Sequence, residues 1–178
     1  WHPYNGEPYM IREVKAKHPN IPMHLTERGP NLAMSDVQDV KWWADVVFGA
    51  FNNGCQSYCS WNLVLDADGQ PNVGKFPCGG LFTIDIEKGT FVESTQAKLF
   101  RQFTPYVDRG AKILSIEQPS DTICAIAFQN PDGNYVVCIV AKNVPNKRQT
   151  LQIKYRGEYM LVSLPFNTWS MTTILIEK

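Results

Sequence analysis

The sequence predicts an α/β segment followed by an all-β segment, with the boundary near Gly110. In the first hundred residues, short apolar runs typical of strands alternate with runs of helical spacing, and such alternation is typical of a parallel sheet. From about Ala111, strand-like runs replace the helical ones. One of them, Tyr135–Ala141, is apolar on both faces, which predicts the central strand of a β-sandwich.

The helix beginning near Ser35 has the strongest signals of the front segment. Ser35 and Gln38 have the spacing of a capping box, apolar residues recur behind them at three- and four-residue steps, and Asn53-Gly54 ends the helix. The other elements expected before Gly110 are a helix over residues 7–18, strands over Met23–Thr26 and Gln56–Leu65, and a short helix over Thr95–Phe103.

The second segment is expected to consist of strands joined by turns. Asn130-Pro131-Asp132-Gly133 is a strong hairpin turn, since Pro favours the second position and Gly the last. The strands expected here are Lys112–Glu117, Thr122–Gln129, Tyr135–Ala141, Thr150–Tyr155, Tyr159–Leu164 and Met171–Glu177.

Composition excludes several classes of function. The 178 residues carry 17 basic and 17 acidic side chains, so there is no charge excess of the kind that binds nucleic acid. The apolar runs are far shorter than the roughly 18 residues of a transmembrane helix. Five cysteines without a CxxC pair predict neither a disulfide scaffold nor a structural zinc site, and nothing indicates a cofactor or another metal.

The size of the front segment limits its architecture. A complete (β/α)8 barrel needs about 250 residues, and only two or three βα units fit before Gly110. This segment is therefore either a small α/β layer or the last part of a barrel. The chain opens at Trp1-His2-Pro3-Tyr4 without an initiator Met or a signal peptide, so we expect it to be a fragment or a processed piece.

Glu27 is the first candidate for chemistry. It ends an apolar strand and is followed by a Gly-Pro loop, the position at which parallel α/β folds place catalytic groups. A carboxylate there can act as a nucleophile or a base. The alternative is that Glu27 is only the polar residue at which a strand ends.

Two further pairs of residues surround this candidate. Trp61 and Asn62 follow the next strand, where an exposed indole would fit the apolar face of a sugar ring; the alternative places Trp61 in the core. His2 and Tyr4 alternate on the preceding run, so they would face the same way and could hydrogen-bond a carboxylate, although each can equally be structural. Trp42-Trp43 is interpreted as packing, with at most one ring fully on the core face of the helix.

Four segments in order resemble one family. They are His2-Pro3-Tyr4-Asn5-Gly6, Met23-His24-Leu25-Thr26-Glu27, Ser60-Trp61-Asn62-Leu63-Val64-Leu65-Asp66 and Gly69-Gln70-Pro71-Asn72. Together they resemble the C-terminal half of a glycoside hydrolase of family 30, the glucosylceramidase and endo-β-1,6-glucanase group. The similarity continues through Phe103–Val107 and Ala127–Gly133, and the run from Trp61 to Asn72 is its most specific part.

The resemblance implies a fold and a domain division. It implies the C-terminal part of a (β/α)8 TIM barrel over residues 1–109, followed by a β-sandwich domain over residues 110–178. Trp1–Tyr4 would end barrel strand six, Met23–Glu27 would be strand seven and Gln56–Asn62 strand eight.

The resemblance also implies roles for individual residues. Glu27 falls on the nucleophile of a retaining double displacement, in which two carboxyl groups stand about 5–5.5 Å apart. His2 and Tyr4 would line the sugar site, with Tyr4 donating a hydrogen bond to Glu27. Trp61 and Asn62 would form the glycone wall, and Asp66 would lie where the aglycone is contacted.

One catalytic part is expected to lie outside the chain. The acid/base Glu of this family follows an Asn, and no Asn-Glu pair occurs here. We therefore expect a glycosidase fragment that is inactive alone, with a carbohydrate or glycolipid substrate and the N-terminal barrel half as partners. By resemblance the whole protein would be secreted or lysosome-like. The alternatives are a non-catalytic carbohydrate-binding or interaction module built on the sandwich, and a xylan-cleaving member of the family.

Overall fold

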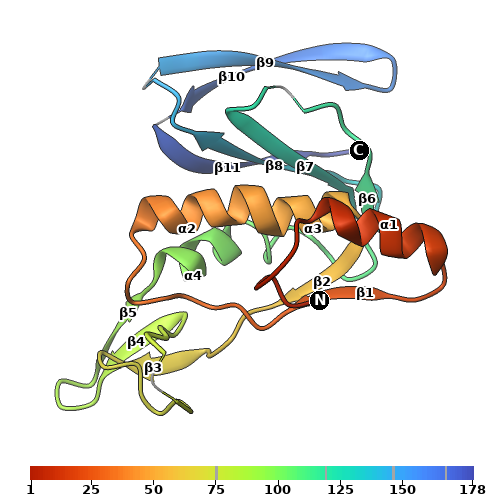
Figure 1. Ribbon diagram of the computed structural model, residues 1–178. Helices are drawn as coiled ribbons and strands as arrows, with labels where there is room; N and C mark the ends of the chain where they lie inside the picture. The colour runs from red at the N-terminus through yellow and green to blue at the C-terminus, as the bar shows by residue number, and fades with distance from the viewer. Residues whose placement is uncertain (75, 119, 146, 167) are drawn as a thin grey trace.

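The computed structural model describes residues 1–178 except positions 75, 119, 146 and 167. Figure 1 shows stacked layers: the β9–β10 hairpin at the top, then a sheet, then a layer of helices, and below them the pair β1 and β2. The helix layer therefore separates the all-β part from the strands that carry the candidate site.

The front part contains a parallel βαβ unit. Helix α1 (Tyr9–Lys17) precedes β1 (Met23–Thr26), which pairs in parallel with β2 (Cys55–Cys59). The connecting helical run comprises α2 (Asp36–Trp42), the π-helical η1 (Trp43–Phe48) and α3 (Gly49–Asn52). The predicted capping box is confirmed, since the Gln38 amide donates to Ser35 Oγ and the Ser35 amide donates to Gln38 Oε1.

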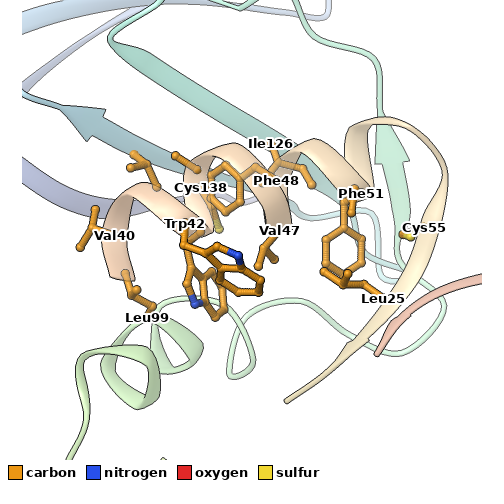
Figure 2. Close-up of a cluster of buried hydrophobic side chains, with 14 of the residues drawn as sticks. Leu25, Val40, Trp42, Val47, Phe48, Phe51, Cys55, Leu99, Ile126 and Cys138 are labelled. Atoms are coloured by element: carbon orange, nitrogen blue, oxygen red, sulfur yellow. The ribbon is translucent and has the colours of Figure 1, made fainter. Parts of the chain in front are cut away.

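The π-helical segment corrects the expectation for Trp42 and Trp43. Both rings are buried, at 7% and 1% exposure, instead of only one. The run lies between the sandwich sheet on one side and β1, β2 and α4 on the other, so it has two core faces. Phe48 lies near Ile126 and Cys138, while Leu25 and Leu99 approach from the opposite layer (Figure 2).

The predicted strand Gln56–Leu65 is wrong as a single element. β2 ends at Cys59, and a separate β3 (Val64–Asp66) follows. Asn62 between them has φ of +62°, a left-handed conformation that ends an extended strand. β3 joins two strands that were not among those expected, β4 (Phe82–Asp85) and β5 (Thr90–Glu93), in a three-stranded sheet.

The second part is a β-sandwich, as predicted. Its larger sheet has the order β11-β8-β7-β6, and β9 pairs with β10 in a separate hairpin. The bounds are β6 Lys112–Leu114, β7 Ile123–Gln129, β8 Tyr135–Lys142, β9 Lys147–Tyr155, β10 Glu158–Phe166 and β11 Trp169–Ile176. β6 is shorter than expected, while the hairpin turn at Asn130–Gly133 joins β7 and β8 as expected.

The central strands β7 and β8 are covered on both faces. Ile126, Phe128, Val136, Cys138 and Val140 face the helical run, whereas Ile123, Ala125, Ile139 and Ala141 pack with residues of β9 and β10. Helix α4 (Thr95–Arg101) adds Leu99 to the helical side. The apolar character of both faces of β8 therefore reflects two cores, one on each side of the sheet.

All five cysteines are free thiols. Cys124 and Cys138 face different cross-strand neighbours, Val140 and Ile126 respectively. Within the described residues, no helix is both long and apolar enough to cross a membrane.

Candidate functional site

The candidate site lies where β1 and β2 end at the same edge. Glu27 follows β1 directly, and its amide donates a 2.9 Å hydrogen bond to the carbonyl of Cys59, the last residue of β2. Glu27 has φ of +66°, a conformation that is uncommon for a residue with a long side chain. The parallel pairing and this backbone turn together fix the position of the Glu27 backbone, from which the carboxylate projects.

His2 is the side-chain partner of the Glu27 carboxylate. Its Nδ1 lies 3.0 Å from Glu27 Oε2, and the side chains are 52% and 34% exposed. The His2 ring packs edge-on against Tyr4, with 5.8 Å between the centroids. The structure thus brings together three residues that the sequence singled out, at a site open to solvent.

Two expectations for this group need correction. Trp1–Tyr4 forms no strand: only Trp1 pairs with β1, donating to the His24 carbonyl and accepting from the Thr26 amide. The Tyr4 hydroxyl donates to the backbone carbonyl of Glu27 at 3.1 Å, not to its carboxylate. The reason is that the left-handed backbone turns the carbonyl toward Tyr4. Partial burial and the nearby Glu27 charge raise the pKa of Tyr4.

Trp61 and Asn62 follow β2 on the neighbouring loop. Trp61 is 43% exposed, so the alternative that places it in the core is wrong. A Cβ at Gly29 would lie 2.0 Å from the Trp61 carbonyl oxygen, so this loop and the loop after Glu27 touch through their backbones. The Asn62 side-chain Nδ2 is buried and, within the described part of the chain, has no hydrogen-bond partner.

The Asp66 side chain forms hydrogen bonds within the turn that follows it. Its Oδ1 accepts hydrogen bonds from the amides of Asp68 and Gln70, at 2.9 and 2.7 Å. These contacts give Asp66 a structural task in the loop after β3. The structure does not join Asp66 to Glu27 through any described contact.

Two residues that contact the site, Tyr58 and Arg28, were not predicted from the sequence. The Tyr58 hydroxyl donates to the Arg28 carbonyl, and the Arg28 guanidinium lies 5.1 Å from the centre of the Trp42 ring. The strand register could have indicated Tyr58, because Tyr58 on β2 pairs with Leu25 on β1, two residues before Glu27.

A hollow lies elsewhere, between β2, α3 and the segment leading into β6. Its volume is about 1390 Å³, and its lining includes Phe51, Gln56, Tyr58, Phe103 and Lys112. His2, Tyr4, Glu27, Trp61, Asn62 and Asp66 do not line it. In the part of the chain that the structure describes, no group of three His, Cys, Asp or Glu side chains could hold a metal ion.

Comparison with known proteins places the second part in a family. Residues 110–174 match the model of the glycosyl hydrolase family 30 beta sandwich domain. The second part of the chain is thus similar to the C-terminal β-sandwich domain of glycoside hydrolase family 30. The predicted resemblance to the C-terminal part of this family is therefore confirmed.

Solved structures extend the similarity of fold over the front part. The endo-β-1,6-glucanase BT3312 and SrfJ from Salmonella typhimurium each match with a TM-score of 0.85 and 20% identity, covering 99% of this chain and 40% of theirs. The catalytic domain of GH30 xylanase C from Talaromyces cellulolyticus matches with a TM-score of 0.63 and 15% identity, covering 89% of this chain and 42% of its own. The chain thus spans about two fifths of the length of these structures.

Proposed function

We propose that the chain is the C-terminal portion of a retaining β-glycosidase that hydrolyses β-glucosides, with Glu27 as the nucleophile. The observation that carries this proposal is the 3.0 Å contact between His2 Nδ1 and Glu27 Oε2 at the carboxyl end of a parallel strand. A His2 Nδ1–H beside the carboxylate can donate a hydrogen bond to it and so orient it. The exposed Trp61 on the adjacent loop supplies an apolar surface for a sugar ring.

In this mechanism an oxygen of Glu27 attacks the anomeric carbon while the glycosidic oxygen leaves with the aglycone. A carboxylic acid from outside this chain protonates that oxygen and later activates the water that releases Glu27. His2 orients the Glu27 carboxylate, and Tyr4 holds the Glu27 backbone carbonyl. Trp61 and Asn62 form the glycone wall, and Asp66 shapes the loop that faces the aglycone.

The proposed partner is the N-terminal half of a (β/α)8 barrel. Residues 1–109 would then be its last strands and helices, and residues 110–178 the sandwich. Among the described residues β2 pairs only with β1, and the 1390 Å³ hollow lies beside β2. A further barrel strand would pair with that edge and fill the hollow. This arrangement supports the expectation that the chain alone is inactive.

The proposed substrate is a β-1,6-glucan or a glucosylceramide-like glycolipid. Similarity of fold to a solved endo-β-1,6-glucanase favours the glucan. The discriminating measurement is hydrolysis of a β-1,6-glucan, glucosylceramide and xylan by the full-length protein, with the released sugars identified. Release of xylo-oligosaccharides alone would favour the xylan-cleaving alternative.

The test of the nucleophile uses the full-length protein and an aryl β-glucoside with a good leaving group. Glu27→Gln should lower turnover by about a thousandfold or more, because an amide cannot form the glycosyl-enzyme. Glu13→Gln, on the exposed face of α1, is the matched control and should leave turnover unchanged. Turnover of Glu27→Gln within tenfold of the parent would refute the assignment. Mass spectrometry after treatment with a 2-deoxy-2-fluoroglucoside should find the label on Glu27.

A further inference from the structure

Tyr58 connects the candidate nucleophile with the buried aromatic cluster of the helix layer. Its hydroxyl donates to the backbone carbonyl of Arg28, the residue after Glu27. Its ring stacks on Phe100, with 5.2 Å between centroids and 9° between planes. Trp42 and Trp43 pack against it from the helical run, each at 5.8 Å.

Two residues of β2 form hydrogen bonds on either side of the left-handed backbone at Glu27. The Cys59 carbonyl accepts from the Glu27 amide before the turn, and Tyr58 donates to the Arg28 carbonyl after it. Between these bonds Glu27 has φ of +66°, which favours glycine and disfavours a residue with a Cβ. A conformation of this kind persists only where surrounding contacts hold it.

We propose that Tyr58 is a positioning residue that holds the left-handed backbone at Glu27 and so aims the Glu27 carboxylate. This inference rests on the proposed function, because it gives Tyr58 a role in orienting Glu27, the proposed nucleophile. No contact described in the structure joins Tyr58 to the Glu27 carboxylate, so its effect passes through the Arg28 carbonyl. The stacked rings fix where the hydroxyl lies, and the hydroxyl fixes the loop.

The surroundings of Tyr58 keep its hydroxyl protonated, so that it remains a hydrogen-bond donor. Burial raises the pKa of Tyr58 well above its usual range, so the hydroxyl keeps its proton wherever a glycosidase works. Arg28 stacks over Trp42, which is also a neighbour of Tyr58, so the residue after Glu27 is held by both its side chain and its carbonyl. The site is therefore supported by the helical run on which the sandwich sheet packs.

The test compares Tyr58→Phe with the parent in the full-length protein. Phenylalanine keeps the ring and its stacking and removes only the hydroxyl. With 2,4-dinitrophenyl β-glucoside, which needs little acid assistance, we expect kcat to fall about tenfold, with KM changed less than about twofold. The unfolding temperature should stay within about 3 °C of the parent. Tyr9→Phe, on the exposed part of α1, is the matched control and should leave all three values unchanged.

Hydrogen exchange provides a second readout that does not depend on activity. The Glu27 amide should exchange faster in Tyr58→Phe, while amides of β7 and β8 keep their protection. An unchanged kcat together with unchanged exchange at Glu27 would overturn the inference. So would a fall in kcat accompanied by loss of protection throughout the chain, since that result describes a packing residue. If Glu27→Gln retains turnover, the proposed function fails, and local exchange still tests whether Tyr58 holds this backbone.

Discussion

The sandwich and the β1–β2 pair use their strands in opposite ways. β7 and β8 bury most of their side chains between two cores, whereas β1 fully buries only Leu25 and β2 only Cys55. The candidate site lies on the sparsely buried pair. The region that supplies most of the packing is thus distinct from the region that carries the reactive groups, and the helical run α2–η1–α3 joins them.

The candidate site obtains its rigidity from the helical run and the sandwich that pack on it. A two-stranded sheet alone is marginally stable, so β1 and β2 depend on the layer above them. Trp43 shows this dependence, because it is buried in the cluster that includes the sandwich strands and it also contacts Tyr58.

The largest expected effect comes from breaking the packing between sandwich and helix. Ile126→Ala removes a fully buried side chain and should lower the free energy of unfolding by about 2–5 kcal/mol. Leu161→Ala, at a site 71% exposed on β10, should change it by less than about 0.5 kcal/mol. Urea unfolding of both variants measures the contrast. Equal losses would mean that burial of Ile126 against the helical run adds nothing to stability.

A smaller effect is expected from a backbone contact at the site itself. Gly29→Ala would put a methyl group 2.0 Å from the Trp61 carbonyl oxygen and should cost about 1–3 kcal/mol. Because the contact involves two loops, hydrogen exchange should increase near Glu27 and Trp61 and remain unchanged in β8. Wild-type stability and local exchange in this variant would show that the loops can separate without cost.

The third prediction concerns the pH dependence of stability at Asp39. Asp39 is 6% exposed and accepts a 2.8 Å hydrogen bond from Gln96, and burial raises the pKa of its carboxyl group. The folded state therefore keeps this proton to a higher pH than the unfolded state does. The contribution of Asp39 to stability is greatest at low pH and declines as the pH rises through the folded-state pKa.

Asp39→Asn should remove this dependence, because asparagine does not titrate. Between about pH 3 and pH 7 the variant should gain stability relative to the parent as the pH rises. Urea unfolding at several pH values measures the difference. Parallel curves for parent and variant would contradict the direction of the shift.

Only a small effect is expected from the ion pair that links the two regions. Lys142 Nζ lies 3.1 Å from Asp45 Oδ1, with side chains 20% and 42% exposed. Lys142→Met should cost about 1 kcal/mol or less, and the cost should shrink in high salt. Lys88→Met, which breaks a more exposed pair within one hairpin, should cost less still. The reverse order would contradict the expectation that the less exposed pair contributes more.

Local signals in the sequence predicted much of the fold. The capping box at Ser35, the end of the helix at Gly54 and the turn at Asn130–Gly133 are set by neighbours in the chain, and each appears in the structure. The β4–β5 hairpin was overlooked, although residues 82–87 alternate apolar and polar side chains and Lys88-Gly89 follows them as a turn. The break at Asn62 also escaped, because a left-handed asparagine inside an apolar run has no signature of its own.

The site was predictable in its members and less so in its contacts. His2, Tyr4 and Glu27 were singled out from strand position and resemblance, and they lie together. The acceptor of the Tyr4 hydroxyl depends on the φ of Glu27, which no spacing rule gives. Tyr58 was overlooked because its importance arises from the register between two strands that are 28 residues apart in the chain.

The shared helical run has a consequence for how such genes can recombine. One face of the run touches Ile126 and Cys138, and the other touches Leu25 and Leu99. A crossover near residue 110 between two diverged genes would join a sandwich from one parent to a helix shaped by the other. Shuffled libraries should therefore yield folded chimaeras mainly when the crossover lies before the helix, at the loop near Asn31, so that helix and sandwich are inherited as one block.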